Sequence, residues 1–372
     1  MSKIVISGYY GYGNLGDEAI LASMVDSFRY FEPNIHITVL SGNPRWTHDF
    51  YRVNSIYRWN LFDITKAFKN ADLFISGGGG LFQDVTGPGS SIYYGGLVTL
   101  AKKLKIPTMI FAQGIGPLNG ILSKNIVKRS FNNLTAITVR DEASSEELVN
   151  LGIDTNNINI TADPALILSS ADRDVARAII AHTSLDPDSP VIGIALRPWQ
   201  TWYERQLKSF SSIITQLAYK YSIQLLLIPF QMSTDLWFAE ELLRSIFCRP
   251  KSHIPPVAIL KQTLNPYEMM SVIKEMQMVI GMRLHSIIMA AANLIPAIGI
   301  VYDPKIYNFS QIVGYPCLPS VTALQEVDVL TDTINTVWNN QNLYKRQLNS
   351  TIFSLKQSAW KNVEIAMQII EK

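Results

Sequence analysis

The chain has 372 residues, which is more than one ordinary domain contains and favours two domains. Of these residues 48% are hydrophobic and 17% are charged, so the chain can bury a substantial core and is not disordered, a coiled coil or a collagen-like repeat. Its 32 basic and 30 acidic residues give a net charge of +2, which does not favour binding to nucleic acid or to a membrane surface. Two cysteines are too few for a disulfide scaffold or a cysteine-rich zinc module.

The apolar segments are typical of a cytoplasmic protein. The first apolar run ends at Gly8, so Lys3–Ser7 indicates a strand rather than a signal peptide. The longest apolar stretch, residues 286–302, contains Asn293 and Pro296 and lacks the roughly 20 unbroken apolar residues of a spanning helix. We expect it to form a buried helix followed by a buried strand.

In the first half of the chain, short apolar runs alternate with helical patterns. This alternation is typical of βαβ units and a parallel sheet. The expected strands are Lys3–Ser7, His36–Leu40, Leu73–Ser76, Thr108–Gln113, Ala136–Val139 and Asn159–Thr161. The expected helices are Asp17–Phe31, Tyr93–Leu104, Ser123–Asn132 and Glu142–Leu151.

The second half repeats the same pattern after a polar segment rich in proline, Ser184–Pro190, which indicates a linker between domains. The expected strands are Val191–Leu196, Ile223–Ile228, Val257–Leu260, Met278–Ile280 and Ala297–Val301. The expected helices are 201–220, Asp235–Ile246, Tyr267–Lys274 and Leu284–Ala292, with a helical tail from residue 323. The sequence therefore predicts an α/β protein with two doubly wound, Rossmann-like domains, residues 1–183 and 191–344, facing a cleft.

Ligands of such sheets bind at the carboxyl ends of the strands, so the residues after each apolar run are the candidate site residues. The first strand runs into the glycine-rich segment Gly8–Glu18, which is neither a Walker loop nor a good dinucleotide fingerprint. It indicates either a structural turn and helix cap or a loop that contacts a sugar through Asn14, Asp17 and Glu18.

Two further strand ends carry few side chains. Four consecutive glycines, Gly77–Gly80, follow the strand that ends at Ser76, and Gln113–Pro117 follows the next strand. A row of backbone N–H groups of this kind binds anions or hydroxyl groups, although close packing of two loops would also require glycine.

Four cationic side chains also come directly after apolar runs: Arg140, Arg197, Arg283 and Lys305. Each one alone is more often a surface residue. Together they point toward a small, multiply charged anion, because the arginine guanidinium binds carboxylate and phosphate through two hydrogen bonds. His285 follows Arg283 by two residues and is a candidate acid or base, with a structural histidine as the alternative. The five histidines lack the spacing of a metal site.

Several of these motifs together resemble the polysaccharide pyruvyltransferases, in particular their CsaB-type branch. The resemblance extends over residues 3–310, and the combination of motifs is specific although each piece alone is not. The segments that carry it are Gly8–Ile20, Gly77–Asp84, Gln113–Pro117, Arg140–Glu142, Asp163–Pro164 and Gly281–His285.

The resemblance implies a fold similar to the GT-B glycosyltransferases, with residues 345–372 forming a helix that crosses back to the first domain. It implies phosphoenolpyruvate as the donor, without a metal or other cofactor, and a lipid-linked or polymeric sugar as the acceptor. Such an acceptor would bring the enzyme to the inner face of the membrane. It further implies a donor site mainly on the second domain.

The chemistry of a pyruvate ketal assigns roles to the matched residues as hypotheses. The expected catalytic residues are His285, Asp17 and Glu18. The expected donor-binding residues are Arg197, Arg283, Leu284, Lys305 and Arg140. The expected acceptor-binding residues are Asn14, Gly16, Gly78, Gly79, Asp84 and Gln113. Two alternatives remain open at this point, a sugar-nucleotide glycosyltransferase of GT-B type and a two-lobed protein that binds an anion or a sugar without catalysis.

Overall fold

The computed structural model describes residues 1–85, 87–200, 204–248 and 254–371. It divides into two compact units, which we describe separately. Unit 1 contains Met1–Leu168 and Ser354–Lys372, and unit 2 contains Ser169–Phe353. Within the described residues, no helix is both long enough and apolar enough to pass through a bilayer.

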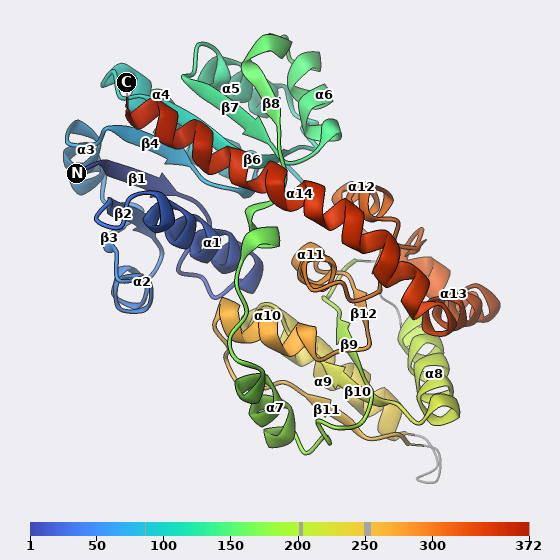
Figure 1. Ribbon diagram of the computed structural model, residues 1–372. Helices are drawn as coiled ribbons and strands as arrows, with labels where there is room; N and C mark the ends of the chain where they lie inside the picture. Colours follow the sequence, from blue (N-terminus) through green and yellow to red (C-terminus); the bar gives the residue numbers. More distant parts are fainter. Residues whose placement is uncertain (86, 201–203, 249–253, 372) are drawn as a thin grey trace. The chain divides into compact units, whose positions relative to one another are not determined.

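Unit 1 is built on one parallel sheet (Figure 1). Its strands are β1 (Lys3–Ser7), β2 (His36–Ser41), β3 (Asn54–Tyr57), β4 (Leu73–Ser76), β5 (Gly79–Phe82), β6 (Thr108–Ile115), β7 (Ala136–Val139) and β8 (Ile158–Ile160). They lie in the order β3-β2-β1-β4-β6-β7-β8, and β5 pairs with β6. The helices between the strands are α1 (Leu15–Phe31), α2 (Pro44–Tyr51), α3 (Leu61–Lys69), α4 (Gly89–Lys103), α5 (Ile121–Phe131) and α6 (Glu142–Asn150).

The central strands of unit 1 are apolar because helices cover both faces of the sheet. β4 and β6 are buried along their whole length. Phe74 of β4 and Ile110 of β6 pack in one core with α4 residues such as Val98. Removal of this apolar surface from water is the main force that holds the unit together.

Unit 2 repeats this plan with a second parallel sheet. Its strands are β9 (Val191–Ala195), β10 (Gln224–Leu227), β11 (Val257–Ile259), β12 (Met278–Gly281), β13 (Ala297–Ile300) and β14 (Cys317–Leu318), in the order β11-β10-β9-β12-β13-β14. Its helices are α7 (Arg173–His182), α8 (Glu204–Tyr221), α9 (Met232–Phe247), α10 (Pro266–Lys274), α11 (Leu284–Ala292), α12 (Pro304–Val313) and α13 (Val327–Asn339).

The last helix, α14 (Gln341–Ile370), ends as part of unit 1, because residues from Ser354 onward group with that unit. The Asn362 side chain is fully buried there. Its Oδ1 accepts a hydrogen bond from the Thr161 hydroxyl at 2.8 Å, and its Nδ2 donates to the Ala162 carbonyl at 3.2 Å. The Trp360 ring lies 5.6 Å from the ring of Tyr30.

The α/β architecture with two parallel, doubly wound sheets confirms the fold class predicted from the sequence. The division between the units differs from the expected one. It falls at Leu168 rather than at the polar segment Ser184–Pro190. The reason is α7, which packs on α10, where Arg173 forms an ion pair with Glu275 at 3.0 Å. The expected helix 201–220 is observed as α8 from Glu204, and residues 201–203 lie outside the described part of the chain.

Candidate functional site

In each sheet there is one point at which the strand order reverses, which we call the switch point. In unit 1, β1 lies between β2 and β4, and in unit 2, β9 lies between β10 and β12. The crevice beyond the carboxyl ends of the strands at such a point is where open parallel sheets bind their ligands. The residues that follow β1, β4, β9 and β12 are therefore the first candidates.

In unit 2, two arginines flank this point. Arg197 follows β9, and Arg283 follows β12 and is the N-cap residue of α11. The two strands are hydrogen-bonded neighbours, and the Met282 N–H donates to the Ala195 carbonyl at 2.9 Å. The strand pairing therefore places both arginines after neighbouring strands, at one edge of one sheet.

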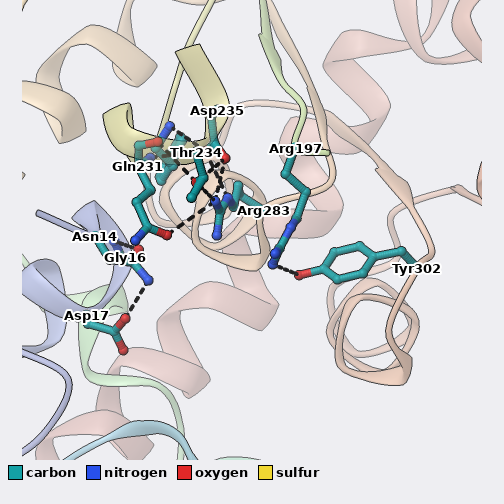
Figure 2. Close-up of polar contacts among 10 residues, drawn as sticks. Asn14, Gly16, Asp17, Arg197, Gln231, Thr234, Asp235, Arg283 and Tyr302 are labelled. Atoms are coloured by element: carbon teal, nitrogen blue, oxygen red, sulfur yellow. Dashed lines mark hydrogen bonds and ion pairs between the residues drawn. The ribbon is translucent and has the colours of Figure 1, made fainter. Parts of the chain in front are cut away.

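Arg283 is held by an acidic partner that the sequence analysis missed. Figure 2 shows its guanidinium forked on the carboxylate of Asp235, a fully buried side chain in the first turn of α9. Its Nε donates to Oδ2 at 2.9 Å, and its Nη2 donates to Oδ1 and, at 3.0 Å, to the Thr234 hydroxyl. Asp235 also accepts the N–H groups of Phe230 at 3.1 Å and Gln231 at 3.0 Å. The fork leaves one edge of the Arg283 guanidinium for a ligand.

Arg197 has a different environment, made of aromatic rings. Its guanidinium carbon lies 5.4 Å from the ring centre of Trp199 and 5.1 Å from that of Tyr302, and its Nη1 donates to the Tyr302 hydroxyl at 3.2 Å (Figure 2). Among the residues that the structure describes, no carboxylate pairs with Arg197, and its buried Nε has no hydrogen-bond partner. A cation in this state is ready to bind an anion.

The remaining predicted donor residues of unit 2 lie on neighbouring helix starts. His285 and Leu284 form the first turn of α11, which has no side-chain cap, and His285 is half-buried. Lys305 is in the first turn of α12, and its Nζ pairs at 2.9 Å with Asp303, the N-cap residue of that helix. The backbone N–H groups at these two helix starts favour bound negative charge.

In unit 1, the glycine-rich segment after β1 forms a cap for α1. The Asn14 side chain accepts the Gly16 N–H at 3.2 Å, and its Nδ2 donates to the Asp17 carboxylate at 2.6 Å (Figure 2). Asp17 lies against Gly79, where a Cβ atom would come within 3.0 Å of Oδ1. Gly79, with φ of 111°, is therefore required both for its backbone conformation and for the room that it leaves to this carboxylate.

Glu18 has a structural environment. Only 2% of the residue is exposed, its Oε1 accepts the Gly11 N–H at 2.8 Å and its Oε2 accepts the Tyr51 hydroxyl at 2.9 Å. Burial raises the pKa of the Glu18 carboxyl to about 7, against the opposing effect of these two hydrogen bonds. The Glu18 Oε1 thus holds the glycine-rich loop to α1, and its Oε2 holds Tyr51 of α2.

The glycines after β4 pack closely against neighbouring backbone, which is one of the two alternatives left open by the sequence. The Gly77 N–H donates to the Ser7 carbonyl at 2.7 Å, and Gly79–Phe82 pair with β6 as β5. Gly78 is buried against Ile20, with a Cβ position 3.0 Å from that side chain.

Two other predicted residues of unit 1 hold loops in place. The fully buried Gln113 donates to the Gly77 carbonyl and accepts the Leu81 N–H at 3.3 Å. Asp84 accepts the N–H groups of Asn119 at 2.9 Å and Gly120 at 2.6 Å. Desolvation opposes the effect of these bonds, which lower the pKa of the Asp84 carboxyl below its usual value.

Arg140 forms a buried ion pair rather than a free anion site. Its Nη1 lies 3.0 Å from Asp163 and its Nε 3.6 Å from Asp141, with 7% of its side chain exposed. The guanidinium covers Gly114, where a Cβ atom would lie 2.5 Å from Nη2. The carboxylates of Asp163 and Asp141 therefore balance the positive charge of Arg140 within unit 1.

Comparison with known proteins decides the family. A family model described as polysaccharide pyruvyl transferase matches residues 14–304, which include both arginines at the switch point of unit 2. The chain belongs to the polysaccharide pyruvyl transferase family. It is also similar to the amylovoran biosynthesis protein AmsJ of Erwinia amylovora, at 21% identity over 93% of this chain and 94% of that protein.

The solved structures similar to this pyruvyltransferase establish its GT-B-like fold. The UDP-GlcNAc 2-epimerase of Methanocaldococcus jannaschii superposes with a TM-score of 0.67 at 14% identity, over 99% of this chain and 100% of that one. The UDP complex of MnaA from S. aureus superposes with a TM-score of 0.68 at 11% identity, over 100% of this chain and 98% of that one. The UDP-glucose complex of HepE from Anabaena superposes with a TM-score of 0.62 at 11% identity, over 100% of this chain and 99% of that one.

Among the described residues of the pyruvyltransferase, no three histidine, cysteine or acidic side chains are grouped so that they could hold a metal ion. The sequence analysis missed Asp235 and Tyr302, which partner the two switch-point arginines. Tyr302 directly follows the apolar run 297–301, so the rule that selected the arginines could also have selected it, whereas Asp235 lies within α9, seven residues after the apolar run 223–228.

Proposed function

We propose that this pyruvyltransferase uses phosphoenolpyruvate as its donor and transfers pyruvate to two hydroxyl groups of one sugar, forming a ketal and releasing phosphate. The observation that carries the donor assignment is Arg197. Beside the switch point of unit 2 it is a cation without a carboxylate partner among the described residues. Phosphoenolpyruvate, with a carboxylate and a phosphate on three carbons, supplies the anionic groups that such a guanidinium binds through two hydrogen bonds.

The neighbouring groups would complete the donor site. Asp235 fixes the orientation of Arg283 and neutralises part of its charge, so the free edge of that guanidinium adds a directed contact rather than a second full cation. The N–H groups at the start of α11, from Leu284 onward, would add positive potential, whereas the charge of Lys305 at the start of α12 is offset by its ion pair with Asp303. Ring contacts to Arg197 exclude water on two sides and strengthen its interaction with an anion.

The reaction needs one proton on the methylene carbon of the donor and the loss of two hydroxyl protons. Protonation of the methylene carbon leaves a cation at the central carbon, to which the first sugar hydroxyl adds. The second hydroxyl then attacks the same carbon, and the bond between that carbon and the phosphate oxygen breaks. Phosphate leaves and takes up the proton of the second hydroxyl. His285, half-buried in the first turn of α11, is the group that we assign to proton transfer in this sequence.

For the acceptor we assign the glycine-rich edge of unit 1, and Asp17 rather than Glu18 as the carboxylate that contacts a sugar hydroxyl. Glu18 is buried with its oxygens bonded to Gly11 and Tyr51, whereas Asp17 is only partly buried and lies at the helix start beside Gly79. A sugar of a polysaccharide or of its lipid-linked precursor is the substrate class, in keeping with the amylovoran role named for the AmsJ relative.

The test is incubation of the full chain with phosphoenolpyruvate and a panel of synthetic and lipid-linked glycosides, with mass spectrometry of the sugars and a phosphate assay. We expect one acceptor to gain the mass of a pyruvate ketal in step with phosphate release. Parallel reactions with UDP-glucose serve as the control for glycosyl transfer. Transfer of a sugar from UDP-glucose, with no pyruvate transferred from phosphoenolpyruvate, would overturn the proposal.

A further inference from the structure

Arg58 is a buried arginine surrounded by four aromatic rings in unit 1. Its guanidinium carbon lies 4.1 Å from the ring centre of Tyr93, 5.3 Å from that of Tyr94, 5.4 Å from that of Trp59 and 5.5 Å from that of Tyr12. We call these five residues the Arg58 cluster. Only 5% of Arg58 is exposed.

The cluster lies at the carboxyl edge of the unit 1 sheet, where ligands bind. Arg58 directly follows β3, and its N–H donates to the carbonyl of Ser41 at the end of β2 at 3.0 Å. Tyr12 comes from the loop after β1, and its ring covers Gly42, where a Cβ atom would lie 2.7 Å from the ring. Four segments far apart in the sequence thus meet at this point.

The charge of Arg58 is not neutralised within the cluster. Among the described residues, no carboxylate forms an ion pair with it, and its buried Nε has no hydrogen-bond partner. Ring faces stabilise such a cation only in part, because a cation–π contact contributes about 0.5–2 kcal/mol. A buried cation is costly without an anionic partner, and among the described residues none supplies a carboxylate to Arg58.

The rings around the cation are accessible on one side. Trp59 is 57% exposed and Tyr12 is 39% exposed, although both are large aromatic residues. Tyr12 stacks on Tyr9 at 4.4 Å and 14°, and Trp59 packs on Tyr93 at 4.6 Å, so both rings are held in place before any ligand arrives. Ordered, exposed rings of this kind provide a flat apolar surface for the C–H face of a sugar ring.

We propose that the Arg58 cluster is a binding subsite for a saccharide that carries an anionic group, with the sugar packed on Trp59 and Tyr12 and its carboxylate or phosphate bound by Arg58. This deepens the proposed function, on which it rests, by naming the chemical class of the acceptor. A uronic acid residue of the polymer and a sugar phosphate of a precursor share the chemistry that Arg58 recognises.

The test is direct titration of the full chain, in the absence of donor, by isothermal calorimetry with three probes: methyl glucuronide, glucose 1-phosphate and neutral methyl glucoside. We expect one or both anionic probes to bind more tightly than the neutral one. The probe with the larger preference distinguishes a uronic acid from a sugar phosphate as the source of the anion.

Arg58→Gln keeps hydrogen-bond donors on a shorter side chain and removes the charge. We expect it to weaken binding of the preferred anionic probe by roughly 10- to 150-fold, the usual effect of losing one charge-assisted contact, and to leave the neutral probe nearly unchanged. Trp59→Ala should weaken all three probes. The matched control is Arg45→Gln in α2, whose side chain is 94% exposed and which should bind as the native chain does.

If Arg58→Gln does not fold, Arg58→Lys replaces it, since the lysine keeps the charge but not the fork and should reduce the anionic preference. Equal affinity for charged and neutral probes, or unchanged binding in both Arg58→Lys and Trp59→Ala, would overturn the subsite. Because this titration contains no phosphoenolpyruvate, its failure is distinct from failure of pyruvate transfer.

Discussion

The pair formed by Arg283 and Asp235 gives a prediction with a magnitude that follows from its burial. Asp235 has a side-chain exposure of 0% and Arg283 one of 10%, and the carboxylate also accepts two backbone N–H groups. Removing one partner of a buried pair costs about 3–5 kcal/mol, because the other charge stays buried without compensation. Asp235→Ala should therefore lower the free energy of unfolding of unit 2 by about this amount.

The measurement is urea unfolding, with hydrogen exchange of peptides from β9 and β12 as the readout for unit 2. Asp332→Ala, at an exposed position of α13, is the matched control and should stay within about 0.5 kcal/mol of the native chain. The double variant Asp235→Leu with Arg283→Met removes both charges and should recover most of the loss.

A loss for Asp235→Ala as small as that for Asp332→Ala would refute this reasoning. It would mean that the Arg283 charge does not depend on Asp235, and that Arg283 is as free to bind the donor as Arg197. A double variant no more stable than Asp235→Ala would show that the cost comes from the backbone N–H groups of Phe230 and Gln231, which lose their carboxylate acceptor.

Three further predictions concern unit 1. The Glu18 pKa of about 7, raised from 4.5 by burial, means that the folded state holds its proton more tightly than the unfolded state. The unfolding free energy should therefore fall by up to about 3 kcal/mol between pH 4.5 and 7, and thermal unfolding of Glu18→Gln across this range should lack that part of the slope. Equal slopes for the two chains would contradict the assignment. Asn14→Ala should lower the free energy of unfolding by about 1 kcal/mol through loss of the α1 cap, measured by chemical denaturation. An unchanged denaturation midpoint would show that this cap does not stabilise the protein. Gly114→Ala should push the Arg140 guanidinium away from Asp163 and cost about 1–3 kcal/mol, which a native-like melting temperature would disprove.

The sequence predicted the sheets well because their strands are continuous apolar runs. Lys3–Ser7, Leu73–Ser76 and Ala136–Val139 begin and end where expected. β3 was missed because its burial is partial and its sequence, Asn54–Tyr57, is mostly polar. β5 was missed because it begins within the run of glycines, which are rare in strands.

The sequence indicated which strand ends carry the candidate site residues, but not which side chains contact them. The rule that side chains after apolar runs face the ligand edge selected Arg197 and Arg283, which follow the neighbouring strands β9 and β12. It could not show that Arg283 is forked on Asp235, since that contact joins residues 48 positions apart in the sequence. Arg58 was missed with the strand that precedes it, and its cluster depends on rings from two other segments, the loop that carries Tyr12 and the helix that carries Tyr93 and Tyr94.

The central claim, donor binding by Arg197, is tested most directly by initial rates of pyruvate transfer at varied phosphoenolpyruvate concentration. Arg197→Gln is compared with Arg244→Gln, an arginine of unit 2 with 67% of its side chain exposed. We predict that Arg197→Gln lowers kcat/KM for phosphoenolpyruvate by roughly 10- to 150-fold, while Arg244→Gln has native rates. Native kcat/KM in Arg197→Gln, with the fold intact, would contradict the account.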